Sequence, residues 1–242
     1  MDRVYFISDV HLGAHSESLE SAKIARLSSF LKSIKEKADY LYVVGDLYDF
    51  WFEYRKAIPK ISLKVAAGLC QLVESGTVVR YFTGNHDLWQ DKYFVEEVGV
   101  ELYHEPASVV HNDLKLFVAH GDGLAAGERK LRFIKKIFKN RQNIFLYRLI
   151  HPDIGIPLAR YVSGRSKAKG KNPYIAQYRE FALKKLEDGF DAVILGHTHE
   201  PVLECSGSKY YINLGDWVTC FTYLQLTEKS FNLKTWEVPD ET

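Results

Sequence analysis

The sequence has few of the features that mark disulfide-bonded, secreted or membrane-spanning proteins. Its 242 residues include only three cysteines, Cys70, Cys205 and Cys220, which form no CxxC pair. We therefore expect reduced packing cysteines and no disulfide framework. No stretch approaches the ~20 apolar residues of a membrane span, and the apolar run at 4–7 is too short for a signal-peptide core. These absences predict a cytoplasmic protein, one that can still touch a membrane surface.

The sequence also has almost no net charge, but its charges are unevenly distributed. The formal net charge is +1 at pH 7, which gives no reason to expect nucleic acid or an acidic partner. Residues 127–172, called here the basic segment, nevertheless contain thirteen lysines and arginines against two acids, Glu128 and Asp153. Such a bias within one stretch indicates a unit distinct from the rest of the chain.

Apolar residues recur at helical spacing among the bases of this segment, and Pro152 and Pro157 interrupt the pattern. We predict that 127–172 is a basic helical cap insertion with a loop at 163–172. The remaining residues, 1–126 and 173–242, would form the core domain.

Apolar runs and helix-period stretches alternate through the first half of the chain. Strands are predicted at 4–8, 40–44 and 78–82, and helices at 18–37 and 61–75. This order favours an α/β layered fold with parallel pairing. Later strands are predicted at 116–119, 192–195, 202–205, 210–213, 221–226 and 231–238. They suggest a second, more antiparallel sheet packed on the first, with helices on the outside.

Five short polar motifs each follow a predicted strand, where functional sites of layered α/β folds collect. Their candidate metal ligands are Asp9, His11, Asp46, Asn85, His120, His197 and His199. This mixture of carboxylates, imidazoles and an amide, with no thiolate, suits Mn²⁺, Fe or Zn²⁺ rather than a structural Cys-type zinc site. Two ions ~3.5–4 Å apart need a bridging carboxylate, for which Asp46 is the candidate.

Each motif alone has an ordinary explanation. An Asp-x-His after a strand is typical of a turn or a surface pair, a Gly-Asn of a turn, and a single histidine of a packed or exposed position. All five motifs together, each at a strand end, favour a metal centre. Burying so many polar groups in one place without metal would cost free energy.

The ordered series Asp-x-His, Gly-Asp-x-x-Asp, Gly-Asn-His-Asp, His-Gly-Asp and Gly-His-x-His resembles the calcineurin-like metallophosphoesterase superfamily. The resemblance implies a four-layer α/β/β/α sandwich. It implies one metal ion on Asp9, His11, Asp46 and His199, and a second on Asp46, Asn85, His120 and His197. A hydroxide between the two ions would attack phosphorus in line with the leaving group.

The resemblance also implies catalytic roles for His86 and Asp87. His86 matches the superfamily's general acid, which contacts a phosphoryl oxygen or protonates the departing oxygen. Asp87 or Asp49 would orient nearby groups. The alternative for His86 is that it only holds Asn85 or the turn.

Within the superfamily, residues 45–52, the basic segment and residues 213–217 resemble the UDP-2,3-diacylglucosamine hydrolases. These are Mn²⁺-dependent pyrophosphatases of lipid A biosynthesis that release UMP and 2,3-diacylglucosamine 1-phosphate. The resemblance implies that the basic segment covers a nucleotide-linked glycolipid and that the enzyme is peripheral to the inner membrane. The candidate substrate contacts are Asn85, His86, Asp122, Arg160, Ser163, Arg165 and Lys167.

One residue departs from this pattern, because well-known members of that hydrolase family have an arginine where this chain has His86. A sugar-phosphate leaving group needs little protonation, whereas a histidine can also serve a poorer leaving group. Two other interpretations stay open: a metallophosphodiesterase or nucleotide pyrophosphatase of different specificity, and a non-catalytic module that keeps the fold. The alternative for the basic segment is a solvated basic helix with an ordinary core face. It lacks an obvious aromatic stacking platform, so no nucleic-acid partner is expected.

Overall fold

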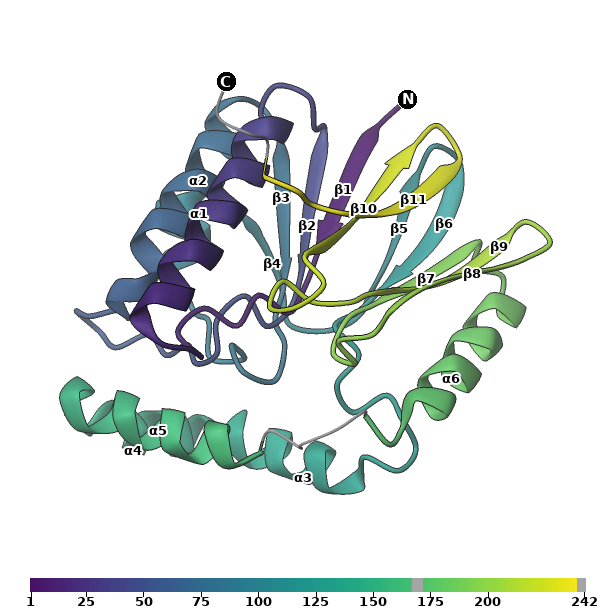
Figure 1. The fold of residues 1–242 in the computed structure, drawn as a ribbon. Helices are drawn as coiled ribbons and strands as arrows, with labels where there is room; N and C mark the ends of the chain where they lie inside the picture. The colour runs from purple at the N-terminus through teal and green to yellow at the C-terminus, as the bar shows by residue number, and fades with distance from the viewer. Residues whose placement is uncertain (167–171, 239–242) are drawn as a thin grey trace.

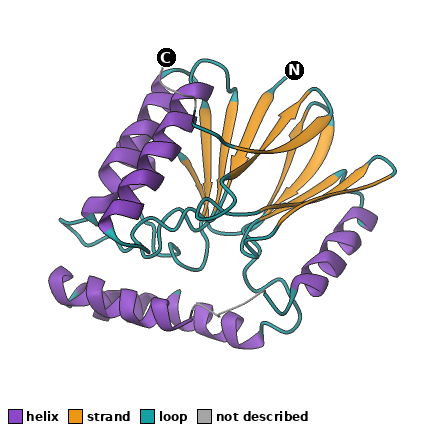
Figure 2. Ribbon diagram, viewed as in Figure 1, coloured by secondary structure: helices purple, strands orange, loops and turns teal. Residues whose placement is uncertain are grey.

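The computed structural model describes residues 1–166 and 172–238 of the chain. Within them, two β-sheets pack face to face, and helices cover the outer faces of the sheets (Figures 1 and 2). This arrangement confirms the predicted α/β/β/α layers. Helices α3, α4 and α5 lie apart from these layers, along the lower edge of the molecule in Figure 1.

The first sheet has the strand order β11-β10-β1-β2-β3-β4. Strands β1 to β4 run parallel, as the alternation of strands and helices predicts, and β10 joins β1 antiparallel with Leu224 opposite Phe6. The strands are β1 (Arg3–Ile7), β2 (Tyr40–Val44), β3 (Val78–Phe82), β4 (Glu101–Tyr103), β10 (Thr222–Thr227) and β11 (Ser230–Thr235). The predicted strands at 40–44 and 78–82 therefore have the correct bounds.

The second sheet has the order β5-β6-β7-β9-β8. Its strands are β5 (Ala107–His111), β6 (Leu114–Val118), β7 (Ala192–Leu195), β8 (Pro201–Ser206) and β9 (Lys209–Leu214). The outer pairs β5–β6 and β8–β9 are antiparallel, but β7 runs parallel to both of its neighbours. The second sheet is thus the more antiparallel of the two in its outer pairs, while its centre is parallel. The expectation that the strands at 221–226 and 231–238 belong to it is wrong, because β10 and β11 lie in the first sheet. Alternating burial specifies which face of a strand is apolar and not which strand it pairs with.

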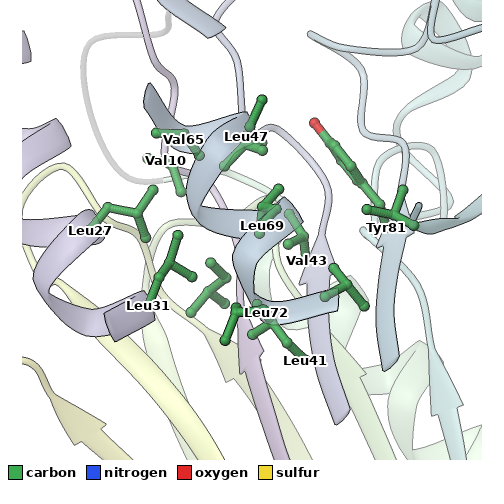
Figure 3. Close-up of a cluster of buried hydrophobic side chains, with 14 of the residues drawn as sticks. Val10, Leu27, Leu31, Leu41, Val43, Leu47, Val65, Leu69, Leu72 and Tyr81 are labelled. Atoms are coloured by element: carbon green, nitrogen blue, oxygen red, sulfur yellow. The ribbon is translucent and has the colours of Figure 1, made fainter. Parts of the chain in front are cut away.

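Helices α1 (Glu17–Ile34) and α2 (Leu63–Glu74) pack on the outer face of the first sheet, and α6 (Ile175–Glu187) packs on the second. Figure 3 shows Leu31 of α1 and Leu72 of α2 beside Leu41 of β2, within one continuous apolar cluster. Burying each such side chain contributes ~1.5–3 kcal/mol. A 3₁₀ turn (Lys60–Ser62) precedes α2, and a π-helical turn (Phe94–Val98) precedes β4.

The basic segment forms α3 (Arg129–Phe138), α4 (Arg141–Arg148) and α5 (Pro152–Ser166). The predicted helical character is confirmed, but Pro157 lies inside α5 and does not end it. Pro152 suits the first helical position, where its missing N–H leaves no intrahelical bond unmade. The prediction of a loop at 163–172 is wrong for residues 163–166, which belong to α5, and residues 167–171 lie outside the described part of the structure. Within the described residues, no helix is long and apolar enough to cross a membrane.

Aromatic side chains attach these helices to the core domain. Trp89 stacks on Tyr147 of α4 with ring centroids 5.4 Å apart, and its indole Nε1 donates to the Phe138 carbonyl at 2.7 Å. Phe52 meets Tyr147 edge to face at 4.6 Å. Aromatic pairs of this kind add ~0.5–1.5 kcal/mol beyond their buried area. The basic segment therefore packs against the loops that follow β2 and β3.

Candidate metal centre

The loops after β1, β2, β3, β6 and β7 meet at one end of the sandwich and carry the predicted metal ligands. Side chains from distant parts of the chain approach each other closely there. His11 Nε2 lies 3.2 Å from His199 Nε2, and Asp46 Oδ2 lies 3.3 Å from His120 Nε2. Because the strands leading into these loops are parallel within each sheet, their carboxyl ends share one edge.

The potential ligand atoms of the described residues form three groups of three, two of which contain only predicted metal ligands. These two are Asp9, His11 and His199, and Asp46, His120 and His197, each with its atoms within 4.8 Å of one another. A further group joins His11, Asp46 and His86. The two main groups adjoin, because His11 Nε2 lies 3.8 Å from Asp46 Oδ2. The resemblance separates the histidines in the same way, but it places Asp46 in both sets and adds Asn85 to the second.

Three buried atoms at this edge test whether metal ions fit. Asp9 Oδ1, Asn85 Oδ1 and His120 Nε2 have no hydrogen-bond partner among residues 1–166 and 172–238. A buried polar atom without a partner costs ~1–3 kcal/mol. Divalent cations would satisfy all three, and carboxylate, amide and imidazole donors suit such ions. The residues present therefore fit a pair of divalent metal ions.

The backbone of this edge is strained at the ligands themselves. Asp9, His11, Asp46, His197 and His199 all have left-handed φ values, of 54°, 48°, 51°, 69° and 61°. Residues other than glycine rarely adopt this conformation, and where they do the cost is ~1–3 kcal/mol each. The fold keeps these residues in conformations that direct their side chains toward one another.

Two motif glycines give the ligands room. A Cβ atom at Gly45, whose φ is +83°, would lie 2.3 Å from His120 Nδ1. A Cβ atom at Gly84 would lie 2.1 Å from Asp46 Oδ1. Neither distance is possible between non-bonded atoms, so glycine at these positions lets the loop backbone close on the ligands.

Two of the histidines are oriented by hydrogen-bond partners outside the ligand set. His120 Nδ1 donates to the Val44 carbonyl at 2.9 Å, which leaves Nε2 facing Asp46. His199 Nδ1 lies 3.4 Å from Asp216 Oδ2. Burial would raise the pKa of Asp216, but His199 and three backbone N–H groups hold the pKa well below its ordinary value. Such partners fix the tautomer and ring orientation of metal-binding histidines.

The sequence alone predicts no role for Asp216 or Glu128. Asp216 lies in the stretch 213–217, which contributed only to the family resemblance. Glu128 was counted as one of two acids among many bases, yet it is buried and lies 3.3 Å from His197 Nε2. Burial would raise the pKa of Glu128, but hydrogen bonds from His197 and Tyr178 lower it, so the carboxylate is ionised at neutral pH.

His86 lies beside the metal ligands in a fixed orientation. Its Nδ1 pairs with the Asp49 carbonyl at 2.9 Å, its backbone N–H donates to Asp46 Oδ1 at 2.9 Å, and its ring meets His11 edge on at 4.8 Å. Burial lowers the pKa of His86. The imidazole is therefore neutral at pH 7, and its Nδ1–H donates a hydrogen bond to the Asp49 carbonyl.

Asp87 is fully buried beneath these loops. Its carboxylate accepts from the backbone N–H groups of Leu47 and Gly84 at 2.8 and 2.7 Å, and from the Tyr81 hydroxyl at 2.5 Å. Burial raises the pKa of Asp87 to about 6, with a contribution from Asp46. These contacts tie the loops after β2 and β3 together, so they favour the orienting role expected from the sequence.

The predicted substrate contacts are only partly visible. Asp122 is buried and forms an ion pair with Lys135 of α3. Arg160, Ser163 and Arg165 lie on α5, and their side chains are outside the described part of the structure. Lys167 lies outside the described residues altogether.

Metal binding at this site is expected to strengthen as the pH rises. Burial would lower the pKa of His11, but Asp49 and Asp9 beside it raise the pKa to about 9. The protonated form therefore stabilises the metal-free protein at neutral pH, and this stabilisation is lost as the pH rises through about 9. Because a metal ion must displace this proton, Mn²⁺ affinity should rise about tenfold per pH unit from pH ~6.5 to ~8.5.

Calorimetric titration in non-coordinating buffers measures this slope. An affinity that does not change with pH would contradict the expectation. The variant His151→Gln, at an exposed position on the basic segment, should retain the wild-type slope.

Comparison with known proteins shows the family of the chain. Residues 2–201 match the model of the calcineurin-like phosphoesterase family, and the chain belongs to that family. A UDP-2,3-diacylglucosamine hydrolase of Porphyromonas gingivalis is 28% identical over 91% of this chain and 92% of its own length. One from Vibrio atlanticus is 27% identical over 97% of this chain and 98% of its own. A solved structure described as a novel archaeal phosphodiesterase covers 96% of this chain and 98% of its own at 18% identity, with a TM-score of 0.48.

The family and the ligand geometry together define the class of enzyme. The chain is a metal-dependent phosphoester hydrolase, as its motifs predict. A His/Asp cluster with room for two metal ions lies at the end of the sandwich.

Proposed function

We propose that the chain hydrolyses the pyrophosphate bond of UDP-2,3-diacylglucosamine to UMP and 2,3-diacylglucosamine 1-phosphate. The observation that carries this proposal is the adjoining pair of three-residue ligand groups in a chain similar, over nearly its whole length, to hydrolases of that name. Mn²⁺ is the proposed metal, since the donor set suits it; Fe and Zn²⁺ suit the same donors.

In this proposal one ion is held by Asp9, His11, Asp46 and His199, and the other by Asp46, Asn85, His120 and His197. Bound divalent cations would neutralise charge on the phosphoryl oxygens and favour ionisation of an attacking water. The chain's own contribution is to hold these ligands in place. His120 and His199 are oriented by Val44 and Asp216, and Asp87 fixes the two loops that carry Asp46 and Asn85.

His86 is the proposed contact to the reacting phosphoryl group. Because Nδ1 pairs with the Asp49 carbonyl, Nε2 is the nitrogen that gains or loses a proton. An anionic phosphoryl oxygen nearby favours the protonated form, whose Nε2–H then donates to that oxygen or to the departing one. A phosphate leaving group needs little help of this kind, whereas an alcohol or phenol leaving group needs more.

The basic segment is the proposed cover for the glycolipid. Its cations suit the diphosphate, and Asp122, Arg160, Ser163, Arg165 and Lys167 remain the proposed headgroup contacts. Its helices also expose large apolar side chains, namely Phe133, Ile137, Phe145, Leu146, Leu149, Ile154, Leu158 and Tyr161. Acyl chains or a bilayer surface would remove these groups from water. These exposed side chains support our proposal of a cytoplasmic enzyme that is peripheral on the inner membrane.

Loss of exposed leucines from α4 and its C-terminal end should weaken membrane binding. Leu146 and Leu149 are 60% and 69% exposed, and each contributes up to ~1.5–3 kcal/mol if fully buried in lipid. The double variant Leu146→Ser/Leu149→Ser should bind anionic phospholipid vesicles at least about tenfold more weakly in a sedimentation assay. Leu203→Ser, which alters an exposed leucine on β8, is the matched control. Equal vesicle binding by both variants would rule out this surface.

The function itself is tested by comparing UDP-2,3-diacylglucosamine with bis-p-nitrophenyl phosphate as substrates in the presence of Mn²⁺. We expect strong preference for the glycolipid, with release of UMP. Preference for the small ester would favour the second candidate, a metallophosphodiesterase or nucleotide pyrophosphatase of other specificity. The observation that favours this candidate is His86, which can assist poorer leaving groups. No turnover of either substrate would support a non-catalytic module.

A further inference from the structure

One acidic side chain of the basic segment turns away from solvent toward the metal centre. Glu128 is 6% exposed, although it lies among thirteen lysines and arginines in residues 127–172. The other acid of the segment, Asp153, has a side chain that is 91% exposed. Buried carboxylates are retained only with partners that compensate their desolvation, so the partners of Glu128 indicate its role.

Both oxygens of Glu128 are used. Oε2 accepts from the Tyr178 hydroxyl of α6 at 2.5 Å and from the Gly123 N–H at 2.8 Å. Oε1 lies 3.3 Å from Nε2 of His197. The carboxylate therefore joins α6, the loop after β6 and a predicted metal ligand on the loop after β7.

The contact with Nε2 determines which nitrogen of His197 remains available. A neutral imidazole has one N–H and one lone pair. When Nε2–H donates to Glu128, the lone pair is on Nδ1, which is then the only nitrogen able to bind a metal ion. Carboxylate partners of this kind fix the tautomer and ring orientation of ligating histidines and raise their basicity.

The position of Glu128 in the chain adds a second consequence. The next residue begins α3, and two side chains of α3 hold the same loop. Arg132 donates to the carbonyls of Gly123 and Ala125 at 3.0 and 2.7 Å, and Lys135 pairs with Asp122. The first turns of α3 are therefore connected to the metal centre through Glu128 and the residues around it.

We propose that Glu128 is a positioning residue for His197. Through Glu128, the packing of α3 against the metal centre and the binding of one metal ion depend on each other. The proposal rests on the metal pair of the proposed function. Glu128 does not itself join a three-residue ligand group among the described residues. It acts on the group formed by Asp46, His120 and His197.

The experiment measures metal binding and not turnover. Full-length protein is stripped of metal and titrated with Mn²⁺, with free Mn²⁺ followed by electron paramagnetic resonance. We expect two ions on the wild-type protein. Glu128→Ala should weaken one of them about 10- to 100-fold and leave the other near its wild-type affinity. Glu128→Gln, which keeps an acceptor for Nε2–H, should recover much of this loss.

Two matched controls separate positioning from charge and from packing. Asp153→Ala removes the other acid of the segment and should bind both ions as the wild type does. Tyr178→Phe removes a hydrogen bond to Oε2 but leaves Oε1 beside His197, so it should change either affinity less than about threefold. Thermal melting without metal identifies a variant that has simply lost stability.

Amide hydrogen exchange reports on the connection to α3. Mn²⁺ should slow exchange in Arg129–Phe138 of the wild-type protein and have little effect there in Glu128→Ala, because coupling between two sites is reciprocal. Unchanged exchange in the wild type would overturn this connection.

The positioning role would be overturned if Glu128→Ala bound both Mn²⁺ ions with wild-type affinity. It would also be overturned by an equal loss at both ions, or by a loss in Tyr178→Phe as large as that in Glu128→Ala. If the wild-type protein bound a single ion, the metal pair of the proposed function would fail. The response of that one ion to Glu128→Ala would still decide whether Glu128 positions a ligand.

Discussion

Replacing Asp46 with asparagine is expected to reduce kcat/KM by about 10³-fold or more, because a loss of several kcal/mol of transition-state stabilisation corresponds to that factor. Asp46 is 1% exposed and lies where the two ligand groups adjoin. Its Oδ2 lies 3.3 Å from His120 Nε2 and 3.8 Å from His11 Nε2, and its Oδ1 accepts from the His86 N–H. An amide oxygen keeps the shape of this side chain but removes the negative charge that both cations would share.

The loss should be visible before any substrate is added. Mn²⁺ titration of Asp46→Asn should show that one ion at most binds with wild-type affinity. Asp113→Asn, which changes an exposed carboxylate in the turn between β5 and β6, should match the wild type in both assays. Two tightly bound ions and turnover within threefold of wild type in Asp46→Asn would show that the metal ions do not share this residue.

The His/Asp cluster at this end of the sandwich could be predicted from the sequence because strand ends are easy to recognise. Buried parallel strands are short apolar runs, and those at 40–44, 78–82 and 192–195 end where the motifs begin. Residues that follow such strands meet at one edge of the sheet whatever the details of packing. Asp46 and His197 therefore belong to one group of potential ligands even though the pairing of β7 was not predicted.

The partners of the ligands could not be predicted in the same way. Glu128 and Asp216 reach histidines that are 69 and 17 residues away in sequence. Glu128 is far from any predicted strand, and Asp216 follows the predicted strand at 210–213 but belongs to none of the five motifs. Their roles follow from where α3 and β10 pack, which depends on contacts that no local pattern encodes. The only signal for Glu128 was its charge, opposite to that of nearly all charged neighbours in its segment.

The same limit explains the error in sheet assignment. Thr222–Thr227 alternates buried and partly buried residues, as expected of a strand with one apolar face. Leu224 and Leu226 pack in the core between the two sheets. A strand of either sheet can place side chains in this core, so their burial does not show which sheet they belong to. Pairing with β1 places β10 in the first sheet, and Asp216 lies in the connection from β9 to β10. In this connection Asp216 Oδ2 lies 3.4 Å from His199 Nδ1.

Replacing His86 with alanine is expected to slow hydrolysis about 10²- to 10⁴-fold for a substrate whose leaving group needs a proton. The imidazole is held by the Asp49 carbonyl with Nε2 as the titrating nitrogen. Its neighbours His11 and Asp46 are predicted metal ligands, so it lies within reach of a phosphoryl group bound there. The two Mn²⁺ affinities should stay near wild type in this variant, which separates a catalytic role from a ligand role.

Leaving-group dependence then decides what His86 does. Thymidine 5′-monophosphate esters of phenol and of p-nitrophenol differ only in how much the departing oxygen needs a proton. If His86 donates that proton, His86→Ala should lose far more activity on the phenyl ester than on the p-nitrophenyl ester. His86→Arg should restore cleavage of the pyrophosphate substrate and not of the phenyl ester, since an arginine contacts phosphoryl oxygens but does not give up its proton.

The matched control is His104→Ala, at a position in the loop between β4 and β5 outside the ligand groups. His104→Ala should hydrolyse the pyrophosphate substrate, the phenyl ester and the p-nitrophenyl ester at rates near those of the wild type. Equal losses on both esters in His86→Ala would assign His86 to binding the phosphoryl group. Near-normal turnover of every substrate would remove it from the mechanism. If His86→Arg restored the pyrophosphate reaction fully, the histidine of this chain and the arginine expected in similar hydrolases would perform the same step. The histidine would then let this enzyme use a wider range of leaving groups without changing its main substrate.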